Sequence, residues 1–392
     1  EAAAAIVQRR NDGRLFCHSR QLERVVELPL ETVRHEDPAS VAVALGGDDK
    51  WARYLVGCLW WLAQHGAEPG GMTVIVDSDV PLGGGVSSSA AIEVATMSAM
   101  AALLGIELSP LERAVACQQV ENRVVGAPCG VMDQVTSAMG RDGKLLEILC
   151  QPGPDGLPAQ VRGSIPIPPG FAFVGLFSGV SHEVSGDPYT DCRVAAFIAQ
   201  KLLEHHGDID SLYLANVDAE HYQNTLRQTL PVKVNGAEFL KVCGDTNDPV
   251  TTVDPSKWYL VQAAADHHVL EMARVTHFIQ CLHRGDVQAA GQLMYESHWS
   301  YSNHANLGHP LTDQLVNMAY AVGVEGGLYG AKITGGGSGG TVAMLIEDTQ
   351  PARDAAASLA GSYERETGRD TILFAASGPG AAQVGTAELT LD

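Results

Sequence analysis

The sequence lacks any long run of hydrophobic residues, and it has little positive charge. No apolar stretch reaches the roughly 18 uncharged residues that a membrane helix needs, so we predict no membrane partner. The chain has 25 Lys and Arg residues against 46 Asp and Glu, which gives a formal net charge of −21. Nucleic-acid binding requires a basic surface, so this balance excludes nucleic acid as the main partner. A phosphate ligand would have to be held by local backbone N–H groups, a metal ion and a few cations.

Closely spaced cysteine pairs are also missing, and the first residues do not show the pattern of a leader sequence. The eight cysteines are scattered and form no C-x-x-C pair, a pattern typical of reduced thiols and not of a disulfide or zinc framework. The first residues, EAAAAIVQRR, show no basic region followed by an apolar stretch, so we expect no secretory signal and a cytoplasmic location. The 392 residues are 45% hydrophobic, which suits a globular chain of two domains.

The periodicity of apolar residues predicts an α+β chain. Helices are expected over residues 51–65, 88–104, 109–124, 191–205, 261–284, 286–301 and 312–322. Strands are expected near residues 5–7, 15–17, 25–28, 72–76, 171–177, 340–346 and 371–375. The pattern holds too few βαβ repeats for a doubly wound sheet. A Pro- and Gly-rich stretch over residues 150–170 predicts the boundary between domain 1–160 and domain 161–392.

The most informative segment is PLGGGVSSSA, residues 81–90. Three glycines allow the backbone to approach a ligand, and the serines then open a helix whose N–H groups and dipole favour an anion. The loop is not of the Walker A type, because no lysine precedes the hydroxyl residues. The alternative is an ordinary strand-to-helix turn with a serine cap. The candidate phosphate-binding residues are Gly83, Gly84, Gly85, Ser87, Ser88 and Ser89.

A second glycine loop, TGGGSGG, covers residues 334–340. Its spacing matches G-x-G-x-x-G, but the residues that follow, TVAMLI, read as a strand and not as the helix of a dinucleotide-binding unit. A glycine loop between two strands instead suits close approach to another loop or to a ligand.

A third segment, ENRVVGAPCGVMD, places Glu121 near the end of a helix and Asp133 after a Pro/Gly turn. Two carboxylates beside a phosphate loop suit a magnesium–nucleotide site, in which one holds the metal and the other faces the attacking hydroxyl. The alternative is that both acids are surface groups.

Together, these segments resemble the GHMP small-molecule kinases, in particular the galactokinase and L-arabinokinase branch. PLGGGVSSSAAIEVA is similar to the second motif of the family, GAPCGVMDQ to its aspartate loop and KITGGGSGGTVAML to its third motif. WARYLVG, GAEFL and DPVTTVDPSKWYLVQAAADHHVLE also match, so the resemblance runs from about Ala5 to about Leu345. It implies a two-domain fold with an N-terminal ribosomal-S5-like domain and a C-terminal ferredoxin-like domain.

The resemblance also implies roles for particular residues. Asp133 would be the catalytic aspartate, as base or as charge stabiliser, and Ser89 with Glu121 would hold Mg²⁺. The ATP site would be formed by Trp51, Tyr54, Gly83, Gly84, Gly85, Ser87, Ser88, Ser89, Gly335, Gly336 and Gly337. The sugar would contact Cys129, Gly130, Asp133 and Tyr189.

One family motif is missing from the 392 residues. Galactokinases begin with a segment of the type G-R-x-N-L-I-G-E-H-x-D-Y, which supplies an arginine near the phosphate and sugar-binding side chains. The sequence contains no such segment and starts at the strand that would follow it. We expect either that the motif precedes the given residues or that the sugar site is incomplete.

The implied reaction is ATP-dependent phosphorylation of the anomeric hydroxyl of galactose or L-arabinose. The stretches SGVSHEVSGDPYTDCRVAAFIAQK and MYESHWSYSNHANLG are more similar to plant-type L-arabinokinases. A non-catalytic regulator that binds nucleotide or sugar is the alternative, and the missing motif favours it. The sequence leaves monomer and dimer open.

Overall fold

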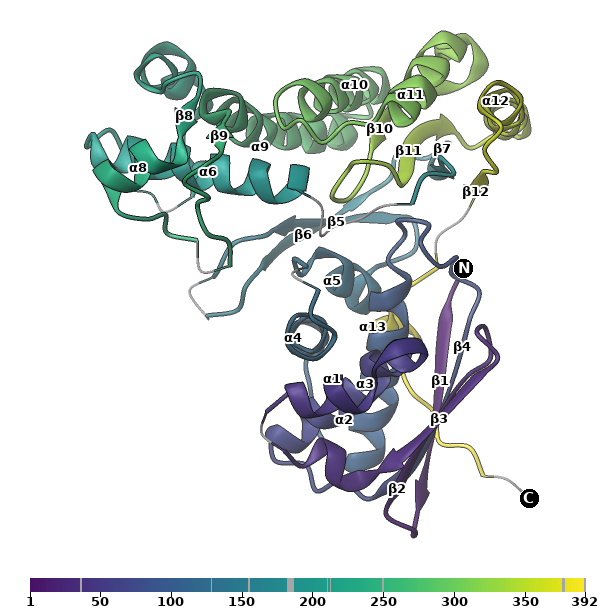
Figure 1. Ribbon diagram of the computed structural model, residues 1–392. Coiled ribbons are helices and arrows are strands. Elements are labelled where there is room, and N and C mark those ends of the chain that lie inside the picture. The colour runs from purple at the N-terminus through teal and green to yellow at the C-terminus, as the bar shows by residue number, and fades with distance from the viewer. Residues whose placement is uncertain are drawn as a thin grey trace. The chain divides into compact units, whose positions relative to one another are not determined.

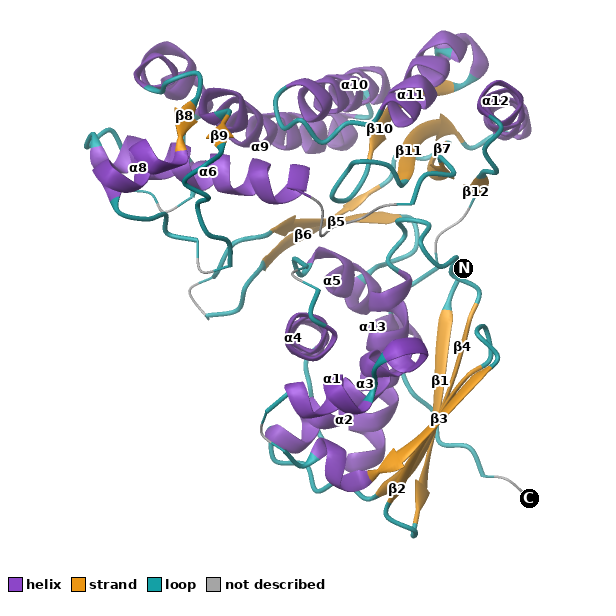
Figure 2. Cartoon of the chain, viewed as in Figure 1, coloured by secondary structure: helices purple, strands orange, loops and turns teal. Residues whose placement is uncertain are grey.

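The computed structural model describes residues 1–35, 37–127, 129–153, 156–181, 187–209, 211, 213–248, 250–375 and 378–390 (Figures 1 and 2). The chain forms two compact units. The first comprises residues 1–165 with the described part of 376–392, and the second comprises residues 166–375.

The first unit contains a four-stranded sheet in the order β1-β4-β2-β3. Its strands are β1 (Ala3–Arg10), β2 (Arg14–Ser19), β3 (Arg24–Pro29) and β4 (Gly71–Ser78). β2 runs parallel to β4, and the other two pairings are antiparallel. Side chains along β2 alternate between buried and more exposed positions, which is the pattern of a sheet with one face on the core.

Helices pack with this sheet around one hydrophobic core. The Ala-rich helix α3 (Ser88–Leu104) ends at Gly105, which takes the left-handed conformation of a C-cap. Helix α4 (Pro110–Val120) begins with a reciprocal capping box between Ser109 and Glu112. The predicted end of α3 at Gly105 and the predicted start of α4 at Ser109 are thereby confirmed. The other helices and strands of this part are η1 (Leu30–Val33), α1 (Ala39–Ala44), η2 (Gly47–Ala52), α2 (Arg53–Gln64), η3 (Glu121–Val125), α5 (Met132–Met139), β5 (Lys144–Leu149) and β6 (Gln160–Pro166).

The second unit is built on an antiparallel sheet in the order β10-β11-β7-β12. Its strands are β7 (Phe171–Phe177), β10 (Leu328–Ile333), β11 (Thr341–Glu347) and β12 (Ile372–Phe374). Buried side chains of this sheet share a core with α11 (Pro310–Val322) and α12 (Gln350–Thr367). A second core joins the long helices α6 (Asp187–His205) and α9 (Val261–Arg284) to the shorter elements around them. The remaining elements are η4 (Leu214–Asn216), α7 (Ala219–His221), η5 (Tyr222–Leu226), η6 (Arg227–Thr229), β8 (Val234–Asn235), α8 (Gly236–Cys243), β9 (Trp258–Tyr259), α10 (Val287–Asn303) and η7 (Val324–Gly326).

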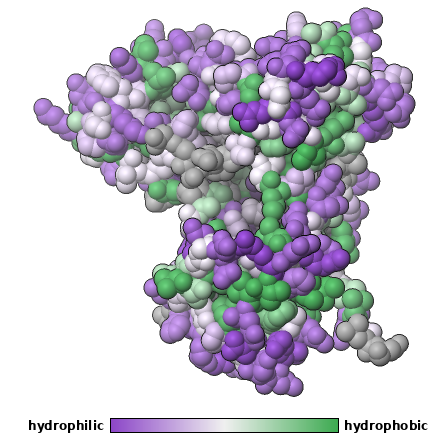
Figure 3. Space-filling view, turned by 45° about the vertical axis from the view of Figure 1, so that its right-hand side comes forward, coloured by the Kyte–Doolittle hydropathy of each residue, from purple (hydrophilic) through white to green (hydrophobic). Residues whose placement is uncertain are grey.

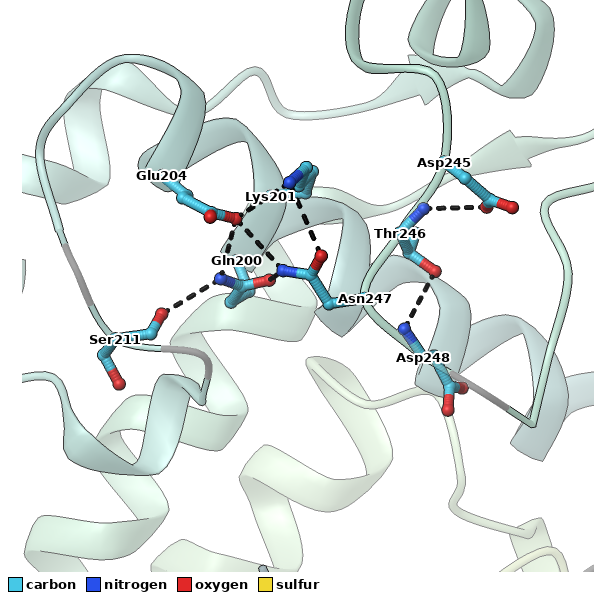
Figure 4. A network of polar contacts seen from close by, with 8 residues as sticks. All are labelled: Gln200, Lys201, Glu204, Ser211, Asp245, Thr246, Asn247 and Asp248. Carbon is cyan, nitrogen blue, oxygen red and sulfur yellow. Dashed lines mark hydrogen bonds and ion pairs between the residues drawn. The ribbon is translucent and has the colours of Figure 1, made fainter.

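A polar network fastens α6 to the segment 245–248 (Figure 4). Asn247 donates to Gln200 and Glu204, and Lys201 donates to both Glu204 and Asn247. One residue further on, Asp248 accepts two hydrogen bonds from Arg193, each of 2.7 Å. The segment 245–248, which has no regular structure, is thus held by side chains of α6.

The C-terminal segment differs from the predicted domain 161–392. Helix α13 (Ala381–Val384) packs against α5 and α3, and the N–H of Gly380 donates to the carbonyl of Gly140 at 2.8 Å. A side chain at Gly380 would overlap the Gly140 backbone, so only glycine permits this approach. Residues 378–390 therefore belong with the first unit, a long-range pairing that local sequence patterns do not indicate.

On the face shown in Figure 3, hydrophilic residues cover much of the surface, with hydrophobic ones between them. Within the described residues, no helix is both long enough and apolar enough to cross a bilayer.

Candidate active site

The loop between β4 and α3 presents the start of a helix. Gly83 and Gly85 have φ values of 71° and 65°, in the left-handed region that glycine adopts readily. Ser87, the N-cap of α3, also lies there at φ 63°, which is uncommon for a residue with a side chain. Its side chain makes no capping hydrogen bond. The first N–H groups of α3 and the positive end of its dipole are therefore arranged to receive an anion.

A pocket of about 130 Å³ lies beside this helix start. Trp51, at the end of η2, and Tyr54, in the first turn of α2, lie in its wall together with Ser88 and Ser89. A mostly apolar pocket lined by aromatic side chains and serine hydroxyls suits an aromatic ring that carries a charged group. The remaining lining residues are Ser19, Gln21, Leu22, Val76, Ser78, Leu82 and Ile92, none of which sequence analysis identified.

Glu121 lies close to Ser89, at the start of α3. Helix α4 widens into a π-turn at Glu121–Val125, a local distortion that is frequent at functional sites. The Glu121 side chain is buried, accepts a 2.6 Å hydrogen bond from the Gln134 amide and lies close to the Ser89 side chain. Burial raises the pKa of Glu121 above its ordinary value, although the nearby Ser89 hydroxyl acts in the opposite direction. The structure therefore brings together Ser89 and Glu121, the two predicted metal ligands.

Asp133 lies half-buried in the first turn of α5, and its charge acts on Glu121. Gly130, in the preceding loop, is exposed. Cys129 is fixed there by a 3.0 Å bond from its N–H to Asn122, and its carbonyl accepts from Gln118 at 3.2 Å. Burial raises the pKa of the Cys129 thiol, so it stays protonated near neutral pH.

The donors around Glu121 suit Mg²⁺. The Ser89 hydroxyl, the Glu121 carboxylate and the nearby Asp133 carboxylate are hard oxygen ligands, and the Oε1 atom of Gln134 is buried without a hydrogen-bond partner among the described residues. No group of three or more His, Cys, Asp or Glu side chains in the described ranges could hold a metal ion. Magnesium commonly binds through one or two carboxylates and the phosphates of a substrate, so this limited donor set fits it.

Sequence analysis missed a third acid in this cluster, Glu93. It lies in the middle of α3, is 0% exposed, and has its carboxyl group beside Gln134 and Glu121. Among the described residues, neither of its oxygens has a partner with hydrogen-bond geometry. Burial, together with the nearby charge of Glu121, holds the pKa of Glu93 well above its ordinary value. Its position was a usable signal, because Glu93 follows Ser89 by one helical turn and is the one charged residue of an apolar helix.

The buried Glu93 predicts an unusual pH dependence of stability. In the unfolded chain the Glu93 carboxyl ionises above its ordinary pKa of 4.5, whereas in the folded protein it stays protonated. The wild type therefore loses stability as the pH rises from 4.5 towards the raised pKa of the folded state. Glu93→Gln removes this loss. We expect the variant to gain on the order of 1–3 kcal/mol in free energy of unfolding at pH 8 and little at pH 4.5, measured by urea denaturation.

Glu112→Gln is the matched control, because hydrogen bonds at the capping box lower the pKa of this exposed acid. The stability of Glu112→Gln relative to the wild type should therefore change with pH in the opposite direction to that of Glu93→Gln. Equal stabilities of Glu93→Gln and wild type at pH 8 would contradict a neutral buried acid.

The remaining predicted residues lie in the second unit. Gly335, Gly336 and Gly337 form the turn between β10 and β11, with Gly335 exposed and Gly337 buried. Tyr189 lies in the first turn of α6 and packs against a small cluster of Cys192, Ala305 and Leu307.

Comparisons with known proteins agree with this architecture. Residues 53–141 match the family described as GHMP kinases N terminal domain, and residues 278–365 match GHMP kinases C terminal. The chain is 36% identical over 379 residues to an L-arabinokinase of Arabidopsis thaliana, covering 86% of this chain and 36% of that protein. It thus spans about a third of the length of this relative.

Solved structures share the fold at low identity. The galactokinase of Lactococcus lactis, complexed with galactose, superposes with a TM-score of 0.74 at 19% identity, covering 97% of this chain and 86% of that one. The mevalonate kinase of L. major, in complex with R-mevalonate, gives 0.53 at 15% identity, covering 96% and 87%. The predicted α+β kinase fold is confirmed, and the chain contains both the N-terminal and the C-terminal domain that characterise the GHMP kinases.

Proposed function

We propose that this chain is an ATP-dependent sugar kinase that phosphorylates the anomeric hydroxyl of L-arabinose or galactose. The observation that carries the proposal is the grouping of Ser89, Glu121 and Asp133 at the open start of α3, beside an aromatic pocket. The similarity to an L-arabinokinase over most of the chain supports the choice of substrate class.

The nucleotide would be held mainly by backbone and aromatic groups. The N–H groups of Gly83–Ser89 would bind its phosphates, and Trp51 with Tyr54 would enclose its base. Gly335–Gly337, in the β10–β11 turn, stay predicted ATP-site residues on the strength of their motif alone. Magnesium held by Ser89 and Glu121 would neutralise phosphate charge, which is the main contribution that phosphoryl transfer requires.

The sugar hydroxyl would face Asp133. A carboxylate there can accept the hydroxyl proton or act as a charge stabiliser, and the Asp133 side chain is half-buried. Cys129 and Gly130 would border the sugar through their backbone, which the bonds to Asn122 and Gln118 hold in place. Tyr189 stays a predicted sugar contact on the strength of the sequence resemblance alone.

Between the two sugars, we expect L-arabinose to be preferred. L-arabinose has the ring stereochemistry of galactose but lacks the exocyclic carbon. A binding pocket therefore distinguishes the two sugars by whether side chains fill the space of that carbon or leave it empty. Such an effect is on the order of 1–3 kcal/mol, or roughly 10- to 200-fold in kcat/KM.

The test is ADP release by the purified chain with Mg·ATP and a panel of L-arabinose, galactose, N-acetylgalactosamine, glucuronate and mevalonate. We expect turnover with L-arabinose, at least about tenfold more efficient than with galactose. Turnover with mevalonate alone would overturn the assignment to sugars. ATP binding without turnover on any compound would favour a regulator that has kept the nucleotide site.

A further inference from the structure

Gln134 connects several parts of the candidate site within the first unit. It lies on α5, directly after Asp133, and is only 1% exposed. Its Nε2 atom donates to the Oε2 atom of Glu121 at 2.6 Å and, at 3.8 Å, to the thiol sulfur of Cys129. One buried amide therefore contacts both a predicted metal ligand and the loop that leads into α5.

The orientation of this amide follows from its neighbours. An ionised carboxylate accepts hydrogen bonds and donates none, so the nitrogen of Gln134 faces Glu121 and the oxygen points elsewhere. Among the described residues, that Oε1 atom is buried and has no hydrogen-bond partner. A buried acceptor without a partner costs free energy, so an apolar side chain of the same length would serve the fold at least as well. The amide is therefore explained by its contact with Glu121 and not by the stability of the core.

Helix α5 stays in place without that hydrogen bond. Val131, Val135 and Ala138, at the N-cap and along the helix, are buried in the hydrophobic core of the first unit. Their packing fixes α5 and with it the amide of Gln134. The last torsion of a glutamate side chain has only a broad preference, so a hydrogen bond at one oxygen of Glu121 determines where the other oxygen points.

We propose that Gln134 is a positioning residue, which holds the Glu121 carboxylate in the orientation that binds Mg²⁺. The inference rests on the proposed function, because it takes Glu121 as a ligand of the metal. Replacing a residue that hydrogen-bonds a metal ligand typically lowers metal affinity by roughly 10- to 100-fold.

Gln134→Met tests this role, because methionine has a similar length but no N–H donor. The quantity to measure is the affinity for a non-hydrolysable ATP analogue, by calorimetric titration with Mg²⁺ and again with EDTA in its place. We expect the gain in affinity that Mg²⁺ provides to shrink by about tenfold, with the affinity in EDTA unchanged. The KM for the sugar should stay near the wild-type value. The melting temperature should be unchanged or higher, because the unpaired Oε1 atom is removed.

Gln119→Met is the matched control in the same unit. Gln119 lies on α4 two residues before Glu121, so the two side chains point to different faces of the helix. Its Oε1 atom accepts a 2.8 Å hydrogen bond from the indole N–H of the buried Trp61. The substitution leaves that N–H without its partner, so it should lower the melting temperature and leave the effect of Mg²⁺ unchanged.

A wild-type response to Mg²⁺ in Gln134→Met would overturn the inference. So would an equal loss of affinity in Mg²⁺ and in EDTA, since the amide would then support the nucleotide site as a whole and not the metal ligand. If neither Gln134→Met nor Gln134→Leu folds, the side chain is structural and the inference falls.

The proposed function can fail separately. If the wild type turns over no sugar but Gln134→Met weakens the effect of Mg²⁺ on analogue binding, the kinase assignment falls and the positioning role stands. If Mg²⁺ does not strengthen analogue binding by the wild type, Glu121 is not a metal ligand and the positioning role falls, whatever the sugar assay shows.

Discussion

Asp133→Asn is expected to lower kcat for sugar phosphorylation by about 10²–10⁴-fold while leaving nucleotide affinity nearly intact. The amide keeps the size and shape of the carboxylate, but it carries no charge and cannot accept the hydroxyl proton. Asp133 lies in the first turn of α5, outside the hydrophobic core, so the substitution should leave the fold unchanged. Steady-state kinetics with the preferred sugar gives kcat, and calorimetric titration with an ATP analogue gives the affinity.

Asp142→Asn serves as the control, because Asp142 is an exposed acid of the same unit outside the site. It should retain wild-type turnover. Substantial residual activity in Asp133→Asn would exclude its catalytic role. A large loss of nucleotide affinity would place Asp133 on the metal instead of on the sugar.

Arg193→Met is expected to destabilise the second unit by about 3–5 kcal/mol at neutral pH. The side chain of Asp248 is 0% exposed and accepts bonds from Arg193, from the Thr251 hydroxyl and from the N–H of Val250. Burial alone would raise the pKa of Asp248, but the bonds from Arg193 and Thr251 hold it below its ordinary value. Without Arg193, the carboxylate remains buried with no opposite charge. Thermal or urea unfolding at pH 7 measures the loss.

The deficit of the variant should shrink towards pH 4. In the wild type, the low pKa of Asp248 stabilises the fold above its ordinary pKa of 3.8, and this contribution is lost as the pH falls. In the variant, the same carboxyl takes up a proton more readily and so avoids the buried charge. A double variant, Arg193→Met with Asp248→Leu, should recover part of the stability.

The exposed pair Arg353–Asp348 provides the comparison, with side chains 33% and 50% exposed. Arg353→Met should cost no more than about 1 kcal/mol. Equal losses for Arg193→Met and Arg353→Met would show that burial of Asp248 does not determine the energy of the pair.

Local sequence signals predicted much of the fold. The bounds of α3, α9 and β7 match the expected ranges, because each begins or ends at a clear signal such as Gly105, Gly285 or Gly170. The expected helix over 109–124 was only partly right, since α4 gives way to a π-turn at Glu121. Helices α5 and α12 and strand β10 were not predicted, although α12 lies in an Ala-rich stretch.

The sequence predicted the motifs of the candidate site better than the contacts and pKa shifts of its side chains. The glycine and serine loop predicted an anion site at the start of α3, and the structure places Glu121 next to Ser89, as a metal site would need. The burial of Glu93 and the bond from Gln134 to Glu121 depend on contacts between different elements, which no local pattern encodes. The roles assigned to the individual site residues stay predictions until the variants are measured.

The bond between Gly380 and Gly140 affects the order in which the chain can be completed. During synthesis, the ribosome makes residues 1–165, then the whole second unit, and only then the segment that carries α13. The first unit therefore lacks the helix that packs on α5 and α3 while more than half of the 392 residues are translated. A nascent-chain experiment should find the first unit incomplete until residues 378–390 have left the exit tunnel, and an isolated version of it would need these residues supplied through a linker or as a separate peptide.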